Sequence, residues 1–234
     1  MAAGERSGAF RRPPELHRLR DRQDAGQRLA SLLEARALVA PVVLAIPRGG
    51  VVVGYEVARQ LSAPLDVLIV RKVGAPGDPE YGLGAVAEGD VVLLDERRAR
   101  AAGYSRADLE PVVRREREAV ARRAAQFRAG RPPLDLGGRT AVLVDDGVAT
   151  GGTVEAGIAV VRHRRPRAVV VGLGVAPPEA VQRLRTVADD VLAVLVPPRL
   201  EAVGEWFERF DQVDDAEVLQ LLARASSSVP TAPP

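Results

Sequence analysis

Short aliphatic runs recur along most of the chain, each bounded by polar, Gly or Pro residues. Five such runs lie at 42–46, 66–70, 140–144, 168–175 and 191–196. Fully apolar runs of this kind are typical of strands that are buried on both faces, as in a parallel sheet. The pattern therefore predicts five core strands.

Segments with apolar residues at helical spacing lie between these runs. The first follows Asp24 and carries a stripe made of Ala25, Leu29, Leu32 and Leu33. Three more helices are expected between the runs, at 51–61, 153–164 and 178–187. Strands that alternate with helices favour βαβ units. We therefore predict an α/β fold with a doubly wound, mostly parallel sheet.

Two segments interrupt the alternation. Residues 73–130 form an insertion after the second predicted strand, with a Gly/Pro-rich loop (73–82), a hairpin (83–87 with 91–94) and a long charged helix (105–128). After the last predicted strand, residues 197–213 contain the only Trp and two of the four Phe residues. This aromatic cluster predicts a small C-terminal hood.

The two ends of the chain lack periodicity. Residues 1–20 are polar and basic, and residues 225–234 are rich in Ser and Pro. Such compositions are typical of disordered tails. We expect one folded domain at 21–224, within a chain of 234 residues.

Composition narrows the class of protein. The hydrophobic fraction is 47%, which is enough for a sizeable core, but no apolar run approaches the ~20 residues that a membrane helix needs. The N-terminus has no apolar signal segment, so we predict a cytoplasmic protein without a membrane partner. The absence of cysteine excludes disulfides and thiolate metal sites.

Charge adds little evidence for a nucleic-acid partner. The net charge is +2, and nearly all of the positive charge is arginine, with Lys72 the only lysine. Aromatic residues make up 3%, too few for a basic surface interleaved with aromatics. The Arg-rich segment 114–123 also carries Glu116 and Glu118, so we interpret it as a solvated helix face. Nucleic-acid binding is therefore disfavoured.

An acid pair stands beside a Gly-rich loop at 141–153. Asp145 and Asp146 follow the third predicted strand, at the end where open parallel sheets bind ligands. Backbone N–H groups of the loop and of the next helix start would form an anion site, with hydroxyl donors from Thr150 and Thr153. The carboxylates must then contact sugar hydroxyls or a metal ion bound to them. A ribose 5-phosphate satisfies both halves of this pattern.

The stretch VLVDDGVATGGT resembles the phosphoribosyl pyrophosphate (PRPP) signature of type I phosphoribosyltransferases. A Walker loop is absent, and a dinucleotide fingerprint would follow the first strand rather than the third. The resemblance implies that Asp145 and Asp146 act in catalysis and hold Mg²⁺, directly or through water. It also implies a substrate-binding loop consisting of Gly147, Val148, Ala149, Thr150, Gly151, Gly152 and Thr153.

Two further motifs match the same family. The stretch Ile46-Pro47-Arg48-Gly49-Gly50 corresponds to its pyrophosphate loop, which implies that Arg48, Gly49 and Gly50 bind substrate. The family often has a cis peptide in this loop, here expected at Arg48–Gly49. The basic pair Arg71-Lys72 ends the second predicted strand and would contact the pyrophosphate as catalytic residues. Residues 73–82 would form a mobile lid.

The resemblance leaves the acceptor base open. The hood would stack the base on Trp206 or Phe207. Hypoxanthine-guanine enzymes of the family carry an aspartate where this chain has Ala149, and the sequence Ala-Thr-Gly at this point favours an adenine or uracil acceptor. The helical insertion is foreign to both of those enzymes. The two histidines, His17 and His163, match no catalytic triad or zinc motif.

The resemblance implies Mg²⁺-dependent transfer of ribose 5-phosphate from PRPP to a nitrogenous base in nucleotide salvage, with release of pyrophosphate. It also allows a homodimer built through the 105–128 helix. Two alternatives stay open. One is a PRPP sensor that binds without turnover, and the other is a sugar-phosphate phosphohydrolase whose acids hold Mg²⁺ directly.

Overall fold

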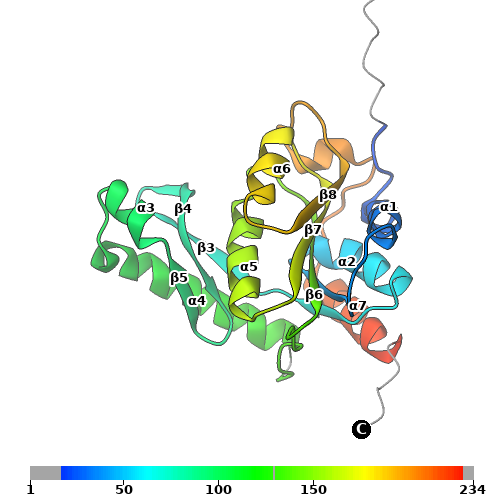
Figure 1. Ribbon diagram of the computed structural model, residues 1–234, viewed down its shortest axis with the longest axis horizontal. Coiled ribbons are helices and arrows are strands. Elements are labelled where there is room, and N and C mark those ends of the chain that lie inside the picture. The colour runs from blue at the N-terminus through cyan, green and yellow to red at the C-terminus, as the bar shows by residue number, and fades with distance from the viewer. Residues whose placement is uncertain (1–16, 129, 229–234) are drawn as a thin grey trace, which may run out of the picture.

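The computed structural model describes residues 17–128 and 130–228, and its centre is a five-stranded parallel sheet (Figure 1). The strand order is β2-β1-β6-β7-β8, and every neighbouring pair is parallel. The strands are β1 (Val42–Ala45), β2 (Leu65–Val67), β6 (Thr140–Gly147), β7 (Ala168–Val175) and β8 (Asp190–Leu195). The predicted parallel α/β architecture is confirmed.

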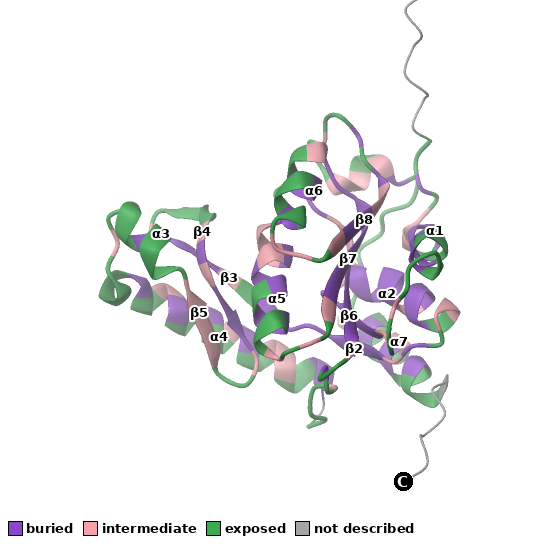
Figure 2. Ribbon diagram, in the orientation of Figure 1, coloured by how far each residue is buried: buried purple, intermediate pink, exposed green. Residues whose placement is uncertain are grey.

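Helices cover both faces of this sheet, as a doubly wound fold requires. One face carries α1 (Arg22–Glu34), α2 (Gly49–Gln60) and α7 (Asp215–Ser228), and the other carries α5 (Gly152–His163) and α6 (Pro178–Arg185). A hydrophobic core lies on each face of the sheet, and alternate strand residues point into one core or the other. Val142 belongs to the core under α1 and α2, and Leu143 belongs to the core under α5 and α6. Figure 2 shows the resulting band of buried residues along β6 and β7.

Helix α1 begins where the side chain of Asp21 accepts a hydrogen bond from the backbone N–H of Asp24, at 2.9 Å. Ala25, Leu29 and Leu33, spaced four residues apart, are fully buried. The predicted stripe was wrong at Leu32, which is 40% exposed. Leu32 lies at the edge of the stripe, where the packed surface of the helix ends.

A second, antiparallel sheet stands apart from the first. It consists of β3 (Val70–Ala75), β4 (Asp78–Ala87) and β5 (Val91–Leu94), and its neighbours are α5, α3 (Glu96–Ala101) and α4 (Arg106–Arg128). The predicted hairpin is confirmed by the pairing of β4 with β5. Helix α3 was not predicted.

The run at 66–70 is not one strand, contrary to the prediction. The chain leaves the central sheet after Val67 and enters the second sheet at Val70. The backbone N–H of Leu68 still donates to the carbonyl of Ala45, at 2.9 Å, so the chain diverges gradually. Residues 73–82, expected as a loop, instead form the tip of the β3–β4 hairpin.

A buried ion cluster anchors the C-terminal end of α4. Nη1 of Arg128 donates to both carboxylate oxygens of Asp66, at 2.9 and 3.1 Å, and Nη2 donates to the carbonyl of Val67 at 2.8 Å. The same guanidinium is paired with Glu88. The cluster thus joins α4 to β2 and to the end of β4, which holds the long helix across the gap between the two sheets.

The folded part extends beyond the predicted domain at both ends. Leu19 is fully buried, and its N–H donates to the carbonyl of Trp206 at 2.9 Å, so residues 17–20 belong to the fold. Helix α7 continues to Ser228, past the predicted tail boundary. The remaining predicted tail residues, 1–16 and 229–234, lie outside the described residues. Within the described part of the chain, no helix is both long and apolar enough to span a membrane.

Candidate functional site

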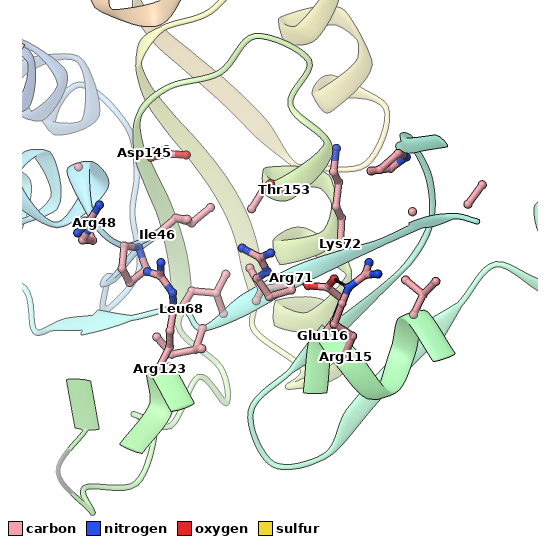
Figure 3. Close-up of a pocket in the computed structure, with 18 of the residues that line it drawn as sticks. Ile46, Arg48, Leu68, Arg71, Lys72, Arg115, Glu116, Arg123, Asp145 and Thr153 are labelled. Atoms are coloured by element: carbon pink, nitrogen blue, oxygen red, sulfur yellow. Dashed lines mark hydrogen bonds and ion pairs between the residues drawn. The ribbon is translucent and has the colours of Figure 1, made fainter. Parts of the chain in front are cut away.

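A cavity of about 640 Å³ opens beyond the carboxyl ends of β1 and β6, where the second sheet and α4 face the central sheet (Figure 3). Three predicted motifs line it: the loop at 46–49, the basic pair in β3 and the acid pair of β6. The lining residues with polar or charged side chains are Arg48, Arg71, Lys72, Arg115, Glu116, Arg123, Asp145, Asp146 and Thr153. The structure therefore brings together residues from four separate parts of the chain.

The two acids lie side by side at the end of β6, but their surroundings differ. The backbone N–H of Asp146 donates to Oδ1 of Asp145 at 2.9 Å. Burial, together with the neighbouring Asp146 carboxylate, raises the pKa of Asp145 well above its usual value. Asp146 is instead engaged by Arg22 of α1, whose Nε donates to Oδ2 at 2.6 Å. Asp145 is thus the acid that most needs a cation or hydroxyl donor from a ligand.

The loop at 46–50 packs against the acids because it contains two glycines. A Cβ atom on Gly49 would lie 1.9 Å from Oδ2 of Asp146, and one on Gly50 would lie 2.8 Å from the carbonyl oxygen of Val144. A larger residue at position 49 would therefore displace the Asp146 carboxylate, and a larger residue at position 50 would clash with the backbone at the end of β6. The structure confirms that the two loops are adjacent.

The cis peptide in this loop is at Pro47–Arg48, one bond earlier than predicted. Helix α2 already begins at Gly49, and Arg48 has helical dihedral angles as its N-cap. The Arg48–Gly49 bond therefore belongs to the helix start, where regular hydrogen bonding requires trans peptides.

The Gly-rich loop leads from β6 into α5. Gly151 caps the helix with a φ of 75°, a conformation that favours glycine. Thr153 faces the main cavity, whereas Thr150 and Gly152 line a second cavity of about 540 Å³ between α5 and the second sheet. Residues at the N-terminus of α5 thus line two cavities, and a helix start of this kind can bind an anion.

Other residues of this loop have structural roles. The N–H of Val148 donates to the carbonyl of Val175 at 2.9 Å, so this N–H is not among the loop N–H groups that could form the expected anion site. A Cβ atom on Gly147 would lie 2.5 Å from the side chain of Val203, which explains why glycine is needed there. Ala149 is exposed at the turn.

The basic pair reaches the cavity from the second sheet. Nε of Arg71 donates to Oε2 of Glu116 at 2.9 Å, and Nζ of Lys72 pairs with Oε1 of Glu80 at 2.7 Å. Both residues lie in β3, not at the end of a central strand as predicted, because the chain changes sheets before Val70. They nevertheless line the same cavity as the acid pair, and Figure 3 shows them together with Asp145.

Helix α4 contributes cavity residues that the sequence interpretation missed. Val112, Arg115, Glu116 and Arg123 line the cavity, and Glu116 is buried. The interpretation of 114–123 as a solvated face was therefore wrong for one side of the helix. The available signal was spacing: residues 112, 116 and 123 lie on one face of a 3.6-residue helix.

The hood aromatics are not arranged as expected. Trp206 is half-buried and Phe207 is 3% exposed, and Phe207 packs against Phe210 with ring centroids 4.9 Å apart. Neither predicted ring lines a described cavity, because both pack inward. The third aromatic residue of this segment, Phe210, is 36% exposed and lines a pocket of about 320 Å³ next to Gly49. The guanidinium of Arg22 lies 3.8 Å above the Phe210 ring.

Comparison with known proteins identifies the family. A family model described as the phosphoribosyl transferase domain matches residues 15–195. The chain belongs to this family. The match confirms the resemblance to type I phosphoribosyltransferases that the acid pair and Gly-rich loop indicated.

Two relatives come from Mycobacterium tuberculosis: "Putative phosphoribosyl transferase Rv0571c" (strain H37Rv) and its counterpart MT0597 (strain CDC 1551). Each is 42% identical over 205 residues, covering 88% of this chain and 46% of the relative. The chain therefore spans about half the length of those relatives. The crystal structure of TT1426 from Thermus thermophilus matches with a TM-score of 0.83 and 48% identity, covering 88% of this chain and 98% of that one.

Proposed function

We propose that the protein transfers ribose 5-phosphate from PRPP to a nitrogenous base and releases pyrophosphate, as a reaction of nucleotide salvage. One observation carries this proposal: the acid pair, residues 46–49 of the glycine loop and the basic pair of β3 line a single cavity. A simple phosphate site would not need the acids, and a simple metal site would not need the cations.

The roles follow from the chemistry of the substrate. The 5′-phosphate would bind at the N-terminus of α5, with the hydroxyl of Thr153 as a donor. The ribose hydroxyls would donate to Asp145 and Asp146. Arg48, Arg71 and Lys72 would neutralise the pyrophosphate as the C1–oxygen bond breaks and its electron pair leaves with that group. The base nitrogen then forms the new bond to C1 and loses its proton to solvent.

The acid pair suits a magnesium ion that arrives with the substrate. Among the described residues, no group of three or more acidic or histidine side chains is placed to hold a metal. Mg²⁺ commonly binds through one or two carboxylates plus substrate phosphates, so Asp145 and Asp146 are a sufficient protein contribution. Bound there, Mg²⁺ would supply neutralisation of the pyrophosphate charge.

The acceptor base would bind in the pocket beside Phe210. This pocket shares Arg48 and Gly49 with the main cavity and adds Asp211 and Gln212, whose polar groups can bond to a base. Ala149 supports an adenine or uracil acceptor, because no acidic side chain stands at that position for a 6-oxopurine.

A second candidate function is PRPP sensing without turnover. The Arg22–Asp146 ion pair favours it, because one of the two acids already has a partner before any substrate binds. A sensor would bind PRPP with Mg²⁺ and consume no base. Its response would be passed to a partner protein or a further domain.

The test is pyrophosphate release from PRPP with Mg²⁺ across a panel of purine and pyrimidine bases, with products identified by mass spectrometry. Asp145→Asn should lower turnover by about 100-fold or more. Gly49→Ala should do the same by displacing the Asp146 carboxylate. Gly137→Ala is the matched control, because its Cβ would meet only the Asp135 carboxylate, at 3.5 Å. PRPP binding without a nucleotide product from any base would favour the sensor.

A further inference from the structure

We propose that helix α4 forms the outer wall of the pyrophosphate subsite, with Arg115 and Arg123 as direct ligands of the pyrophosphate group. This assignment rests on the proposed function and extends it to the helical insertion. It gives that segment a role in substrate binding, whereas the family motifs alone account only for the loops and the basic pair of β3.

The position of the two arginines supports this role. In Figure 3, Arg115, Glu116 and Arg123 rise from α4 on one side of the cavity, and Asp145 and Thr153 lie on the opposite side. The ribose and the 5′-phosphate are assigned to that opposite side. The part of the substrate that faces α4 is therefore the pyrophosphate.

The charges around the cavity support the same conclusion. Five cationic and three acidic side chains line it, and one of the acids, Asp146, is already paired with Arg22. Among the described residues, Arg123 has no ion-pair partner, although its side chain is half-buried at the cavity wall. A half-buried guanidinium without a carboxylate partner is suited to a ligand anion.

Glu116 positions two other arginines of the cavity, Arg71 and Arg115. Its two carboxylate oxygens accept from Nε of Arg71 at 2.9 Å and from Nε of Arg115 at 3.0 Å. Each guanidinium keeps its remaining N–H groups for other acceptors. A carboxylate that fixes two guanidiniums side by side prepares them for bidentate contact with phosphate oxygens.

The helix supplies its own matched controls. Arg122 is the neighbour of Arg123, but its side chain is 71% exposed and pairs with Glu118 at 4.0 Å. Arg114 and Arg115 are both exposed, but only Arg115 lines the cavity. Replacing either member of a pair by glutamine changes the net charge equally, whereas only one member of each pair lines the cavity.

The experiment is calorimetric titration of the full chain with pyrophosphate, with PRPP and with ribose 5-phosphate, each in the presence of Mg²⁺. Arg123→Gln and Arg115→Gln should each weaken pyrophosphate and PRPP binding by about tenfold or more. Arg122→Gln and Arg114→Gln should change it by less than about twofold. Ribose 5-phosphate should bind all variants equally, because it lacks the pyrophosphate.

The outcomes separate this inference from the proposed function. If wild type binds PRPP but Arg123→Gln and Arg115→Gln bind it equally well, the assignment of α4 is overturned and the function stands. Equal losses in the control variants would show a general charge effect and also overturn it, as would an equal loss of ribose 5-phosphate binding. Failure of wild type to bind PRPP would overturn both the function and the inference.

Discussion

Helix α4 carries arginines at two places, and these arginines differ in how their charges are compensated. At its C-terminal end, Arg128 is buried and bonded to Asp66, Glu88 and a backbone carbonyl. Nearer its middle the helix lines the cavity, where Arg115 shares Glu116 with Arg71 and Arg123 has no ion-pair partner among the described residues.

This difference distinguishes charged residues that stabilise the fold from charged residues that are suited to binding a ligand. A charge buried for structure must be fully paired, since burial of an unpaired ion costs several kcal/mol. At the cavity, Arg123 on one side and Asp145 on the other are both incompletely compensated. A cavity with an uncompensated positive charge on one side and an uncompensated carboxyl group on the other is suited to a ligand that has both anionic and hydroxyl-bearing parts.

The largest effect on stability should come from Arg128→Ala. It leaves Asp66 and Glu88 buried without their cation, so we expect a loss of about 3–5 kcal/mol in the free energy of unfolding. Urea denaturation measures it. Arg100→Ala is the control, because the Arg100–Glu96 pair is exposed and should contribute only about 0–1 kcal/mol. Similar losses of stability in the two variants would show that the buried Arg128 cluster contributes no more to stability than an exposed ion pair.

Glu116→Gln should have the next largest effect. The buried carboxylate accepts from two guanidiniums, and the amide can replace only one of those acceptor oxygens. We expect a loss of about 1–3 kcal/mol in the free energy of unfolding, measured by the same urea titration. An unchanged midpoint would mean that solvent already satisfies both arginines.

Asp145→Asn should act in the opposite direction and stabilise the ligand-free protein at neutral pH. It removes a carboxylate whose charge is disfavoured by burial and by Asp146. Differential scanning calorimetry should show a rise of a few degrees in Tm, since ~1 kcal/mol corresponds to roughly 2–4 °C for a chain of this size. Turnover should fall in the same variant. A lower Tm would contradict the inferred repulsion.

The pH dependence of stability should reveal the same carboxyl group. Because the folded state binds the Asp145 proton more tightly than the unfolded state, this group makes stability fall as pH rises from its ordinary pKa of 3.8 to the raised value. Below that window both states are protonated and the effect vanishes. The free energies of unfolding of wild type and Asp145→Asn, measured as a function of pH, should therefore change together at acid pH. Above that range, the free energy of unfolding of wild type should fall relative to that of the variant. Parallel curves would refute the raised pKa.

Arg123→Gln should have the smallest effect on stability. The side chain has no ion-pair partner to lose among the described residues, so we expect a change within about 0.5 kcal/mol. Urea denaturation tests whether Arg123 contributes little to stability, and the calorimetric titration of the same variant tests whether it contributes to pyrophosphate binding. A loss comparable to that of Arg128→Ala would place Arg123 among the charges that hold the fold.

Much of the part of the candidate site that contains the acid pair was predictable. Asp145, Asp146 and the glycines around them are neighbours in the chain, at the end of a fully apolar run, and that local pattern indicates both the strand end and the anion loop. The parts that could not be predicted depended on distant contacts. Val148 uses its N–H for β7, and Phe207 packs inward, which leaves Phe210 as the exposed ring.

The sequence by itself determined the parallel core, the edge of the sheet where the candidate site lies and the family, because apolar periodicity and glycine placement act over a few residues. Only the tertiary structure decided that β3 leaves the central sheet and that Arg115 and Arg123 face Asp145. The reason is that the position of α4 depends on Arg128, Asp66 and Glu88, which are far apart in the chain and meet only on folding. A local pattern of hydrophobic and polar residues does not predict contacts between residues that are so far apart in the sequence.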